Sequence, residues 1–267
     1  MSRTGTTISA VGSEPRPRED GRTVLKRLAA LMDSFDEESP TLSLVELSRR
    51  ADLPKSTTHR LAEQLRGLGW LERDHNGYRI GTRLFELGGL ATQRTALRDA
   101  AFPHLAALAS KTSMAVQLGV LDRGDVVYLE RLLVAGYTLP TRLGGRMPAY
   151  CTALGKAMLA FDDTEADDVL AGDLPARTPN SITCPDELRA RLAEVRAEGV
   201  AREVGEAVEG LACVAAPVRN SGRAIAAVSV TGPAERFDWP AVTEAVQQCA
   251  VAIWNARFGP AKSRAAV

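Results

Sequence analysis

The sequence predicts an α+β protein, and two patterns of apolar residues carry that prediction. Apolar residues recur at helical spacing through residues 23–68, and two short strand-like runs follow on either side of Asn76 and Gly77. From residue 115 onward, pairs of apolar runs are joined by glycine-containing turns, with helical stretches before, between and after them. We therefore expect a small helical domain with a hairpin, a connecting helix, and a larger domain built on an antiparallel sheet.

The length and composition are those of a globular protein with two domains. The chain has 267 residues, of which 45% are hydrophobic and 25% charged, and its formal net charge is zero. The sequence has no apolar run of about 18 residues that could span a membrane. Its N-terminus lacks the charged and apolar segments of a signal peptide. We therefore expect a cytoplasmic protein with no membrane partner.

Two amphipathic helices are expected at the start of the smaller domain. Apolar residues at helical spacing over 23–35 predict the first. Ser43 followed by Glu46 resembles a capping box, in which the two side chains reciprocally satisfy free N–H groups at a helix start. The second helix should therefore begin at this point and end near Asp52.

The third helix carries the most specific pattern. Pro54 suits its first position, where a fixed φ helps and the missing N–H is not needed. Its apolar residues recur at i, i+4 and i+7 and should face the core; they are Leu61, Leu65 and Leu68. The other face is polar and basic near the N-terminus, as in helices that contact base edges in DNA. We assign DNA contact on this helix to Lys55, Ser56, Thr57, His59 and Arg60.

A hairpin directly after the third helix completes a winged helix-turn-helix. Trp70 and Leu71 begin it, and Asn76-Gly77 at its tip predicts a type I′ turn, which needs positive φ at both central residues. Residues 48–83 contain eight Lys/Arg against four Asp/Glu, and eight minus four leaves a charge of +4. Such a basic patch is expected where a protein contacts phosphates. The predicted contacts from the wing are Arg73, Asn76 and Arg79.

Helical sequence connects the winged helix to the larger domain. Apolar residues over 84–91 and 97–108 lie at helical spacing, with Pro103 inside the second run. They exceed what one neighbouring domain needs to cover, so we expect these helices to contribute to a dimer interface. The predicted domains are a disordered tail at 1–20, a winged helix at 21–82, linker and dimerisation helices at 83–112, and the larger domain at 113–260.

The larger domain should hold a pocket against one face of its sheet. Residues 115–133 predict a hairpin, and residues 137–142 predict a further extended segment. Helices are expected at 152–161, 164–171, 185–198 and 239–258, and strands at 200–204, 211–218 and 224–231. Thr152 should cap the first of these helices. Two hairpins separated by helices leave room for a small-molecule pocket.

The cysteines and histidines do not indicate a metal site or a disulfide framework. Cys151, Cys184, Cys213 and Cys249 are separated by 33, 29 and 36 positions, so no two form a C-x-x-C pair. The three histidines are scattered. Free, mostly buried thiols in a reducing compartment are the expected state. We predict no metal and no cofactor.

Three stretches together resemble one family. They are LPKSTTHRL in the third helix, PAYCTALGKAMLA in the middle of the chain and EGLACVAAPVRNSGRAIAAVSVTGP near its end. In that order, over roughly residues 23–258, the chain resembles the IclR-type bacterial transcriptional regulators. The resemblance implies a winged helix, a linker helix used in dimerisation, and a C-terminal GAF-like effector-binding domain. It also implies a dimer or dimer of dimers that acts at promoters, most often as a repressor.

The resemblance also implies where an effector binds. Residue by residue, it assigns the pocket to Ala153, Leu154, Gly155, Glu203, Cys213, Ser229 and Thr231. Ser229 and Thr231 alternate on a strand, so both hydroxyls should face one side. Free N–H groups at the start of the helix after Thr152 would suit a carboxylate. We expect a small organic acid or aromatic metabolite, with Glu206 as an alternative to Glu203.

Two other functions stay open on the residues alone. A winged helix can serve only as a protein-interaction module, and binding that falls steeply with salt would favour DNA instead. A cysteine-dependent enzyme with Cys213 as nucleophile would need a base. His59, His75 and His104 all precede the predicted effector domain, so we expect no enzyme.

Overall fold

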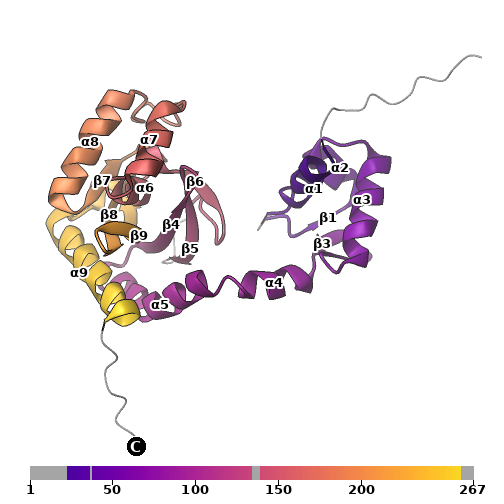
Figure 1. Cartoon of the computed structure of the whole chain (residues 1–267), viewed down its shortest axis with the longest axis horizontal. Coiled ribbons are helices and arrows are strands. Elements are labelled where there is room, and N and C mark those ends of the chain that lie inside the picture. The colour runs from indigo at the N-terminus through magenta and orange to yellow at the C-terminus, as the bar shows by residue number, and fades with distance from the viewer. Residues whose placement is uncertain (1–22, 37, 134–138, 260–267) are drawn as a thin grey trace, which may run out of the picture. The chain divides into compact units, whose positions relative to one another are not determined.

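The computed structural model of the chain describes residues 23–36, 38–133 and 139–259. The chain divides into two compact units, Met1–Leu90 and Ala91–Val267 (Figure 1). The tail predicted at residues 1–20 lies outside the described residues, as does the start of the extended segment predicted at 137–142. In the described part of the chain, no helix is long and apolar enough to cross a membrane.

The N-terminal unit contains the expected helices and wing. Its elements are α1 (Val24–Met32), β1 (Thr41–Leu42), α2 (Leu44–Ala51), α3 (Lys55–Gly67), β2 (Leu71–Arg73), β3 (Tyr78–Ile80) and α4 (Thr82–Gly89). The three strands form an antiparallel sheet in the order β1-β3-β2. The core joins α1, α2, α3 and the wing through buried side chains that include Leu31, Leu47, Leu61, Leu71 and Tyr78.

The start of α2 is capped on one side only. The Ser43 hydroxyl accepts the backbone N–H of Glu46 at 3.2 Å, as the sequence predicts. The Glu46 carboxylate does not return a bond to the cap. It accepts hydrogen bonds from Arg49 and Arg50, which hold the pKa of Glu46 at about 2. The reciprocal half of the capping box is therefore wrong, because two arginines one turn later offer charged donors.

The buried stripe of α3 differs from the predicted one at its end. Leu61 and Leu65 are buried as predicted, whereas Leu68 is 64% exposed. The helix ends at Gly67 and Pro54 precedes it as the cap residue, so Leu68 lies outside the helical repeat. Thr58 is buried instead, and its hydroxyl donates to the carbonyl of Pro54 at 3.1 Å.

The turn of the wing is built around Asp74 and is not the predicted type I′ turn. The Asp74 carboxylate accepts the backbone N–H of Asn76 at 2.7 Å and that of Gly77 at 3.2 Å. Asn76 does not have the positive φ that a type I′ turn requires. Gly77 has a φ of +143°, and a Cβ there would lie 2.2 Å from the carbonyl oxygen of Leu42. The close approach of β1 therefore requires glycine.

The C-terminal unit is a six-stranded antiparallel sheet with helices on both faces. Its elements are α5 (Thr92–Thr112), β4 (Ala115–Asp122), β5 (Asp125–Leu132), β6 (Arg146–Pro148), η1 (Ala149–Cys151), α6 (Ala153–Leu159), α7 (Asp163–Ala171), α8 (Pro185–Glu198), β7 (Ala201–Val204), β8 (Leu211–Asn220), β9 (Arg223–Pro233), η2 (Ala234–Arg236) and α9 (Trp239–Phe258). The strand order is β6-β5-β4-β9-β8-β7. The predicted helices and the strands at 115–133, 200–204, 211–218 and 224–231 are confirmed, whereas residues 139–142 of the predicted extended segment form no strand and β6 was not predicted.

Each face of this sheet has its own hydrophobic core. Helices α5 and α9 cover one face (Figure 1). On this face, Val116 and Leu118 of β4 share a core with Leu105 and Ile253. Helices α6 and α8 cover the other face, together with η1. The two cores follow from the alternation of side chains along each strand. The second core contains the cavity described below.

The connecting helices have opposite environments. In α5 the apolar residues at helical spacing within 97–108 are buried in the chain; they are Leu97, Ala101, Leu105 and Leu108. Pro103 lies within α5. In α4 no residue is buried, and Phe85 is 82% exposed. The apolar face predicted for this stretch is thus uncovered within one chain.

Candidate functional site

The exposed face of α3 carries the side chains that the sequence assigns to DNA. Lys55, Ser56, His59 and Arg60 are exposed, and Thr57 is half-buried. Among the described residues, neither Lys55 nor Arg60 has an ion-pair partner. Their charges are therefore available to an external anion. Thr58, one position from Thr57, packs only in the core.

The arginines of the wing have internal partners. Arg73 lies 3.6 Å from the carboxylate of Glu63 and stacks over the Tyr78 ring at 5.2 Å. Arg79 pairs with Glu72 at 2.8 Å and with Asp74 at 3.8 Å. Both arginines remain about half exposed. Asn76 is exposed at the tip of the turn.

The Glu63 side chain mainly contacts the wing and contributes little to the exposed face of α3. Its carboxylate accepts hydrogen bonds from Arg66 at 2.8 Å and from the Tyr78 hydroxyl at 2.9 Å. These bonds, that from Arg66 first, hold the pKa of Glu63 below its ordinary value. The carboxylate thereby fixes β3 against α3 and sets the distance between helix and wing.

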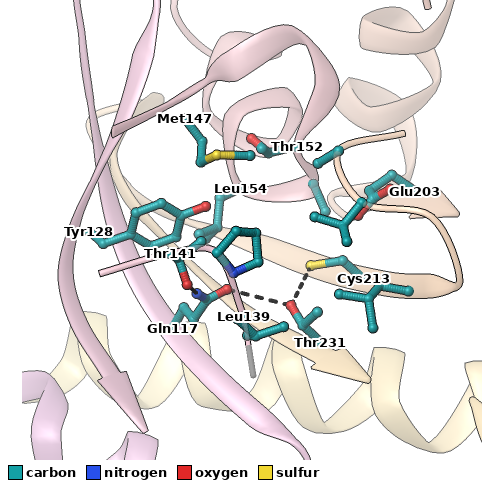
Figure 2. A pocket seen from close by; sticks show the side chains of 15 residues that line it. Gln117, Tyr128, Leu139, Thr141, Met147, Thr152, Leu154, Glu203, Cys213 and Thr231 are labelled. Atoms are coloured by element: carbon teal, nitrogen blue, oxygen red, sulfur yellow. Dashed lines mark hydrogen bonds between the residues drawn. The ribbon is translucent and has the colours of Figure 1, made fainter. Parts of the chain in front are cut away.

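The second candidate site is a cavity of about 40 Å³ between the sheet and the start of α6 (Figure 2). Five of the seven predicted pocket residues line it: Ala153, Leu154, Glu203, Cys213 and Thr231. Further lining residues were not predicted; they include Gln117, Tyr128, Thr141, Met147 and Thr152. The volume holds about three water molecules at roughly 10–15 Å³ each. A ligand as large as an aromatic ring requires the lining side chains to move outward.

Strand register brings the polar lining together. Thr231 of β9 lies opposite Cys213 of β8, and Cys213 lies opposite Glu203 of β7. The Thr231 hydroxyl donates to the Cys213 sulfur at 3.1 Å and lies 3.5 Å from Oε1 of Gln117. The Gln117 amide in turn donates to the Thr141 hydroxyl at 2.7 Å (Figure 2). The sequence could have indicated Gln117 as a pocket residue, because it is a polar residue at an inward-facing position of an apolar strand.

Gly155 and Ser229 are not among the residues that line this cavity. A Cβ on Gly155 would lie 2.1 Å from the carbonyl oxygen of Ala149, so the glycine permits close packing of α6 against η1. Ser229 is fully buried, and its hydroxyl has no hydrogen-bond partner among the described residues. It lies opposite Ala215 and Gln117 in the sheet, one step deeper than Thr231.

The N-terminus of α6 is partly satisfied from within. Thr152 caps the helix as predicted, since its hydroxyl accepts the N–H of Gly155 at 3.0 Å. The helix has seven residues, all buried, including Lys156. The helix start therefore offers little to a carboxylate, in contrast to the sequence expectation.

A buried charge cluster lies beside the cavity. Nζ of Lys156 bonds to the Glu206 carboxylate, and the Glu203 carboxylate accepts the backbone N–H of Glu206 at 2.9 Å. Burial raises the pKa of Glu203 to about 7 and also raises the pKa of Glu206. Glu203 lines the cavity and Glu206 pairs with Lys156, so the two acids that the sequence leaves as alternatives have separate positions.

Glu203 is expected to make stability depend on pH. Its pKa is higher in the folded chain, at about 7, than its ordinary value of 4.5, so ionisation favours unfolding. The free energy of unfolding should therefore fall by about 3 kcal/mol between pH 4.5 and pH 8, and Glu203→Gln should remove this loss. Urea titrations followed by Trp239 and Trp254 fluorescence, in a Trp70→Phe background, would measure it in the C-terminal unit.

Glu209→Gln is the matched control for this measurement. Glu209 is exposed and lies in the same loop as Glu206, so its removal should leave the pH profile unchanged. A Glu203→Gln profile that overlays the wild-type profile would show that Glu203 titrates normally.

Cys151 and Cys213 have the environment of structural thiols, whereas Cys184 is exposed. Burial raises the pKa of Cys213 to about 12 and the pKa of Cys151 to about 11. A raised pKa suppresses the nucleophilic thiolate. Within the described ranges, no cluster of three or more His, Cys, Asp or Glu side chains could hold a metal ion.

A basic recognition helix with a wing, joined to a domain with an internal cavity, defines a ligand-responsive DNA-binding regulator. Residues 24–75 match the IclR helix-turn-helix domain, and residues 89–255 match the bacterial transcriptional regulator IclR C-terminal domain. The chain therefore belongs to the IclR family of bacterial transcriptional regulators, as its resemblance indicated. It is a transcriptional regulator and not an enzyme.

Curated relatives and solved structures agree with this assignment. The chain is 31% identical to the HTH-type transcriptional regulator XynR of Escherichia coli, over 89% of this chain and 98% of XynR. It is also 31% identical to the Pca regulon regulatory protein of Pseudomonas putida, over 79% and 75% of the two chains. An IclR homologue from Microbacterium hydrocarbonoxydans, crystallised with 4-hydroxybenzoate, matches with a TM-score of 0.80 and 29% identity, covering 89% of this chain and all of that one.

Proposed function

We propose that this regulator acts as a repressor, and that a small metabolite bound in its C-terminal cavity changes its affinity for promoter DNA. The observation that carries the proposal is the combination of a basic face on α3, whose Lys55 and Arg60 have no ion-pair partner among the described residues, with a mainly apolar cavity in the other unit that carries a row of polar groups. A ligand can shift such a protein only if it binds the DNA-competent and DNA-free states with different affinities.

In this proposal, α3 enters the major groove of double-stranded promoter DNA. Lys55 and Arg60 supply unpaired positive charge, while Ser56, Thr57 and His59 supply hydrogen-bonding groups on the same exposed side. Arg73, Asn76 and Arg79 contact the backbone from the wing. Because Arg73 and Arg79 are paired with carboxylates, their contribution should be smaller than that of the α3 side chains.

The proposed effector is a small organic acid or aromatic metabolite. Its binding site comprises Ala153, Leu154, Glu203, Cys213 and Thr231, with Gly155 and Ser229 shaping the walls behind them. The cavity is lined mainly by apolar side chains with a row of polar groups along the sheet, as small-molecule sites usually are. The similar Microbacterium protein was crystallised with 4-hydroxybenzoate, which is an aromatic acid.

We further propose a homodimer, or a dimer of dimers, with α4 in the interface. Phe85 and Leu90 are exposed apolar residues on this stretch, and contact with a second chain would bury them. A dimer would also present two recognition helices to DNA, whose contacts add to the weak binding of a single small basic patch. The corresponding domain proposal is a winged helix at 21–82, linker and dimerisation helices at 83–112, and the effector domain at 113–260.

Selection of genomic DNA is the experiment that tests this function. Purified protein is mixed with sheared genomic DNA of its source organism, with and without extracted metabolites, and the retained fragments are sequenced. We expect enrichment of one near-palindromic intergenic site that metabolites reduce. A site enriched more strongly with metabolites would overturn the expectation that the effector releases the repressor from DNA.

Salt dependence at the selected site separates DNA binding from a protein-interaction role. If a dimer neutralises about six phosphates, its affinity should fall about a thousandfold between 50 and 200 mM salt. Fluorescence anisotropy with a labelled operator would measure this. The absence of any retained fragment in either condition would favour the protein-interaction module.

A further inference from the structure

The side chains that line the cavity include one carboxyl group and no cationic group. Of the residues that line it, Glu203 carries a carboxyl group, and none is a lysine, an arginine or a histidine. The nearest buried cation, Lys156, is already bonded to Glu206. A carboxylate ligand would therefore meet the Glu203 carboxylate and no cationic side chain in the mainly apolar lining. Two such groups cannot both stay ionised at close range.

We propose that a carboxylate ligand enters this cavity together with one proton, which it shares with the Glu203 carboxyl group. The inference rests on the proposed function of the cavity as the effector site and names the class of ligand it takes, a weak acid. The proton is supplied by the acid form of the buffer in solution. Whether Glu203 or the ligand formally holds it, the bound pair carries one negative charge and is joined by an O–H···O⁻ hydrogen bond.

The position of Glu203 suits this role. It lies on β7 with its carboxylate fixed by the backbone N–H groups of Glu206 and Ala207, and it is 6% exposed. Figure 2 shows it on the same side of the cavity as Cys213, with Thr231 further along the sheet. These bonds hold the carboxyl group at the wall, where Glu203 also lines a second cavity with Glu187 and Arg191 of α8 and Arg202 of β7.

The groups around Glu203 leave the proton as the means of balancing charge. Lys156 of α6 and Glu206 form a neutral pair, so an ionised Glu203 gives the buried cluster a net charge of −1 before a ligand arrives. Cys213 of β8, Cys151 of η1 and Tyr128 of β5 also face it.

Burial raises the pKa of all three of these neighbours, so each stays neutral near pH 7. Arg177 acts on Tyr128 and Cys151 from an exposed position outside the lining. Burial also places the pKa of Glu203 itself at about 7. A proton is therefore available to this carboxyl group at physiological pH, which supports the geometric argument.

Calorimetry with two probes of one shape tests the proposal. Benzoate and the neutral benzyl alcohol are titrated into the full-length protein between pH 6 and pH 9, in buffers of different ionisation enthalpy. We expect benzoate to bind with uptake of up to one proton, and its affinity to fall about a hundredfold across this range. The affinity of benzyl alcohol should change less than about threefold.

Two variants assign the effect to Glu203. Glu203→Gln keeps a hydrogen-bond donor at the wall but cannot titrate, so benzoate affinity should become independent of pH and proton uptake should disappear. Glu209→Gln, an exposed residue of the same region, should behave as wild type. Circular dichroism at each pH shows that the variants remain folded.

The outcomes separate this inference from the proposed function. Benzoate affinity that is flat with pH, or proton uptake that persists in Glu203→Gln, overturns the inference and leaves the effector site intact. Binding of benzyl alcohol without benzoate at pH 6 overturns the inference, because the ligand is then not a weak acid, and leaves the cavity as a site for a neutral aromatic effector. Binding of neither probe, in a protein that still binds its operator, overturns the aromatic-effector proposal and this inference with it.

Discussion

Replacing Arg60 with alanine is expected to weaken operator binding by about 2–6 kcal/mol in a dimer, since a good base contact contributes about 1–3 kcal/mol at each of two half-sites. Arg60 is exposed on α3 and has no internal ion pair among the described residues, so its loss removes an external contact and no structural one. Ligand affinity should be unchanged. Anisotropy with operator DNA and calorimetry with the effector measure the two quantities.

Arg66→Ala provides the matched control on the same helix. Arg66 is 52% exposed but pairs with Glu63 at 2.8 Å near the C-terminal end of α3, where a recognition helix no longer contacts bases. We expect a change in operator affinity of less than about 0.5 kcal/mol. If Arg60→Ala and Arg66→Ala lose the same operator affinity, α3 contributes to binding through its overall positive charge and not through a specific base contact by Arg60.

Replacing Lys156 with methionine should destabilise the C-terminal unit by about 3–5 kcal/mol, because it leaves the buried Glu206 carboxylate without its cation. The Lys156 side chain is fully buried, and Oε2 of Glu206 has no partner among the described residues. Arg191 acts on Glu206 without a hydrogen bond among the described residues, so it does not replace the bond from Lys156. Urea unfolding monitored by Trp239 and Trp254 would measure the change.

A double variant distinguishes a lost ion pair from lost packing. If Lys156→Met is combined with Glu206→Met, no charge is left unpaired, and we expect most of the stability to return. A double variant as unstable as Lys156→Met alone would mean that the shape of the Lys156 side chain, rather than the pair, stabilises α6. Operator binding by the N-terminal unit should persist in both variants.

The order of elements could be predicted from sequence because it depends on local patterns. The final helix, Trp239–Phe258, and the cap of α6 at Thr152 are found as predicted. Both follow from spacing or from a capping residue within a few positions. The predicted burial of Leu68 was wrong, because Leu68 lies just beyond the end of α3. The predicted turn of the wing was also wrong, because the Asp74 carboxylate binds the backbone of the turn.

The site was less predictable, because it depends on which strands become neighbours. Cys213 and Thr231 could be named from motifs, but Gln117 reaches the same cavity only because β4 pairs with β9. Lys156 lies inside a motif that resembles the family pattern, yet burial of a lysine has no local signal. Its partner, Glu206, is fifty positions away. Pairing across such distances is a property of the fold.

One strand belongs to both cores of the C-terminal unit. In β4, Gln117 faces the cavity, while Val116 and Leu118 face the core that includes α5. Helix α5 is the element that continues the chain toward the DNA-binding unit. The residue that faces the cavity and the residues that face α5 are thus neighbours on one strand. A ligand that shifts the β4 backbone at Gln117 would therefore also shift Val116 and Leu118, which pack under α5.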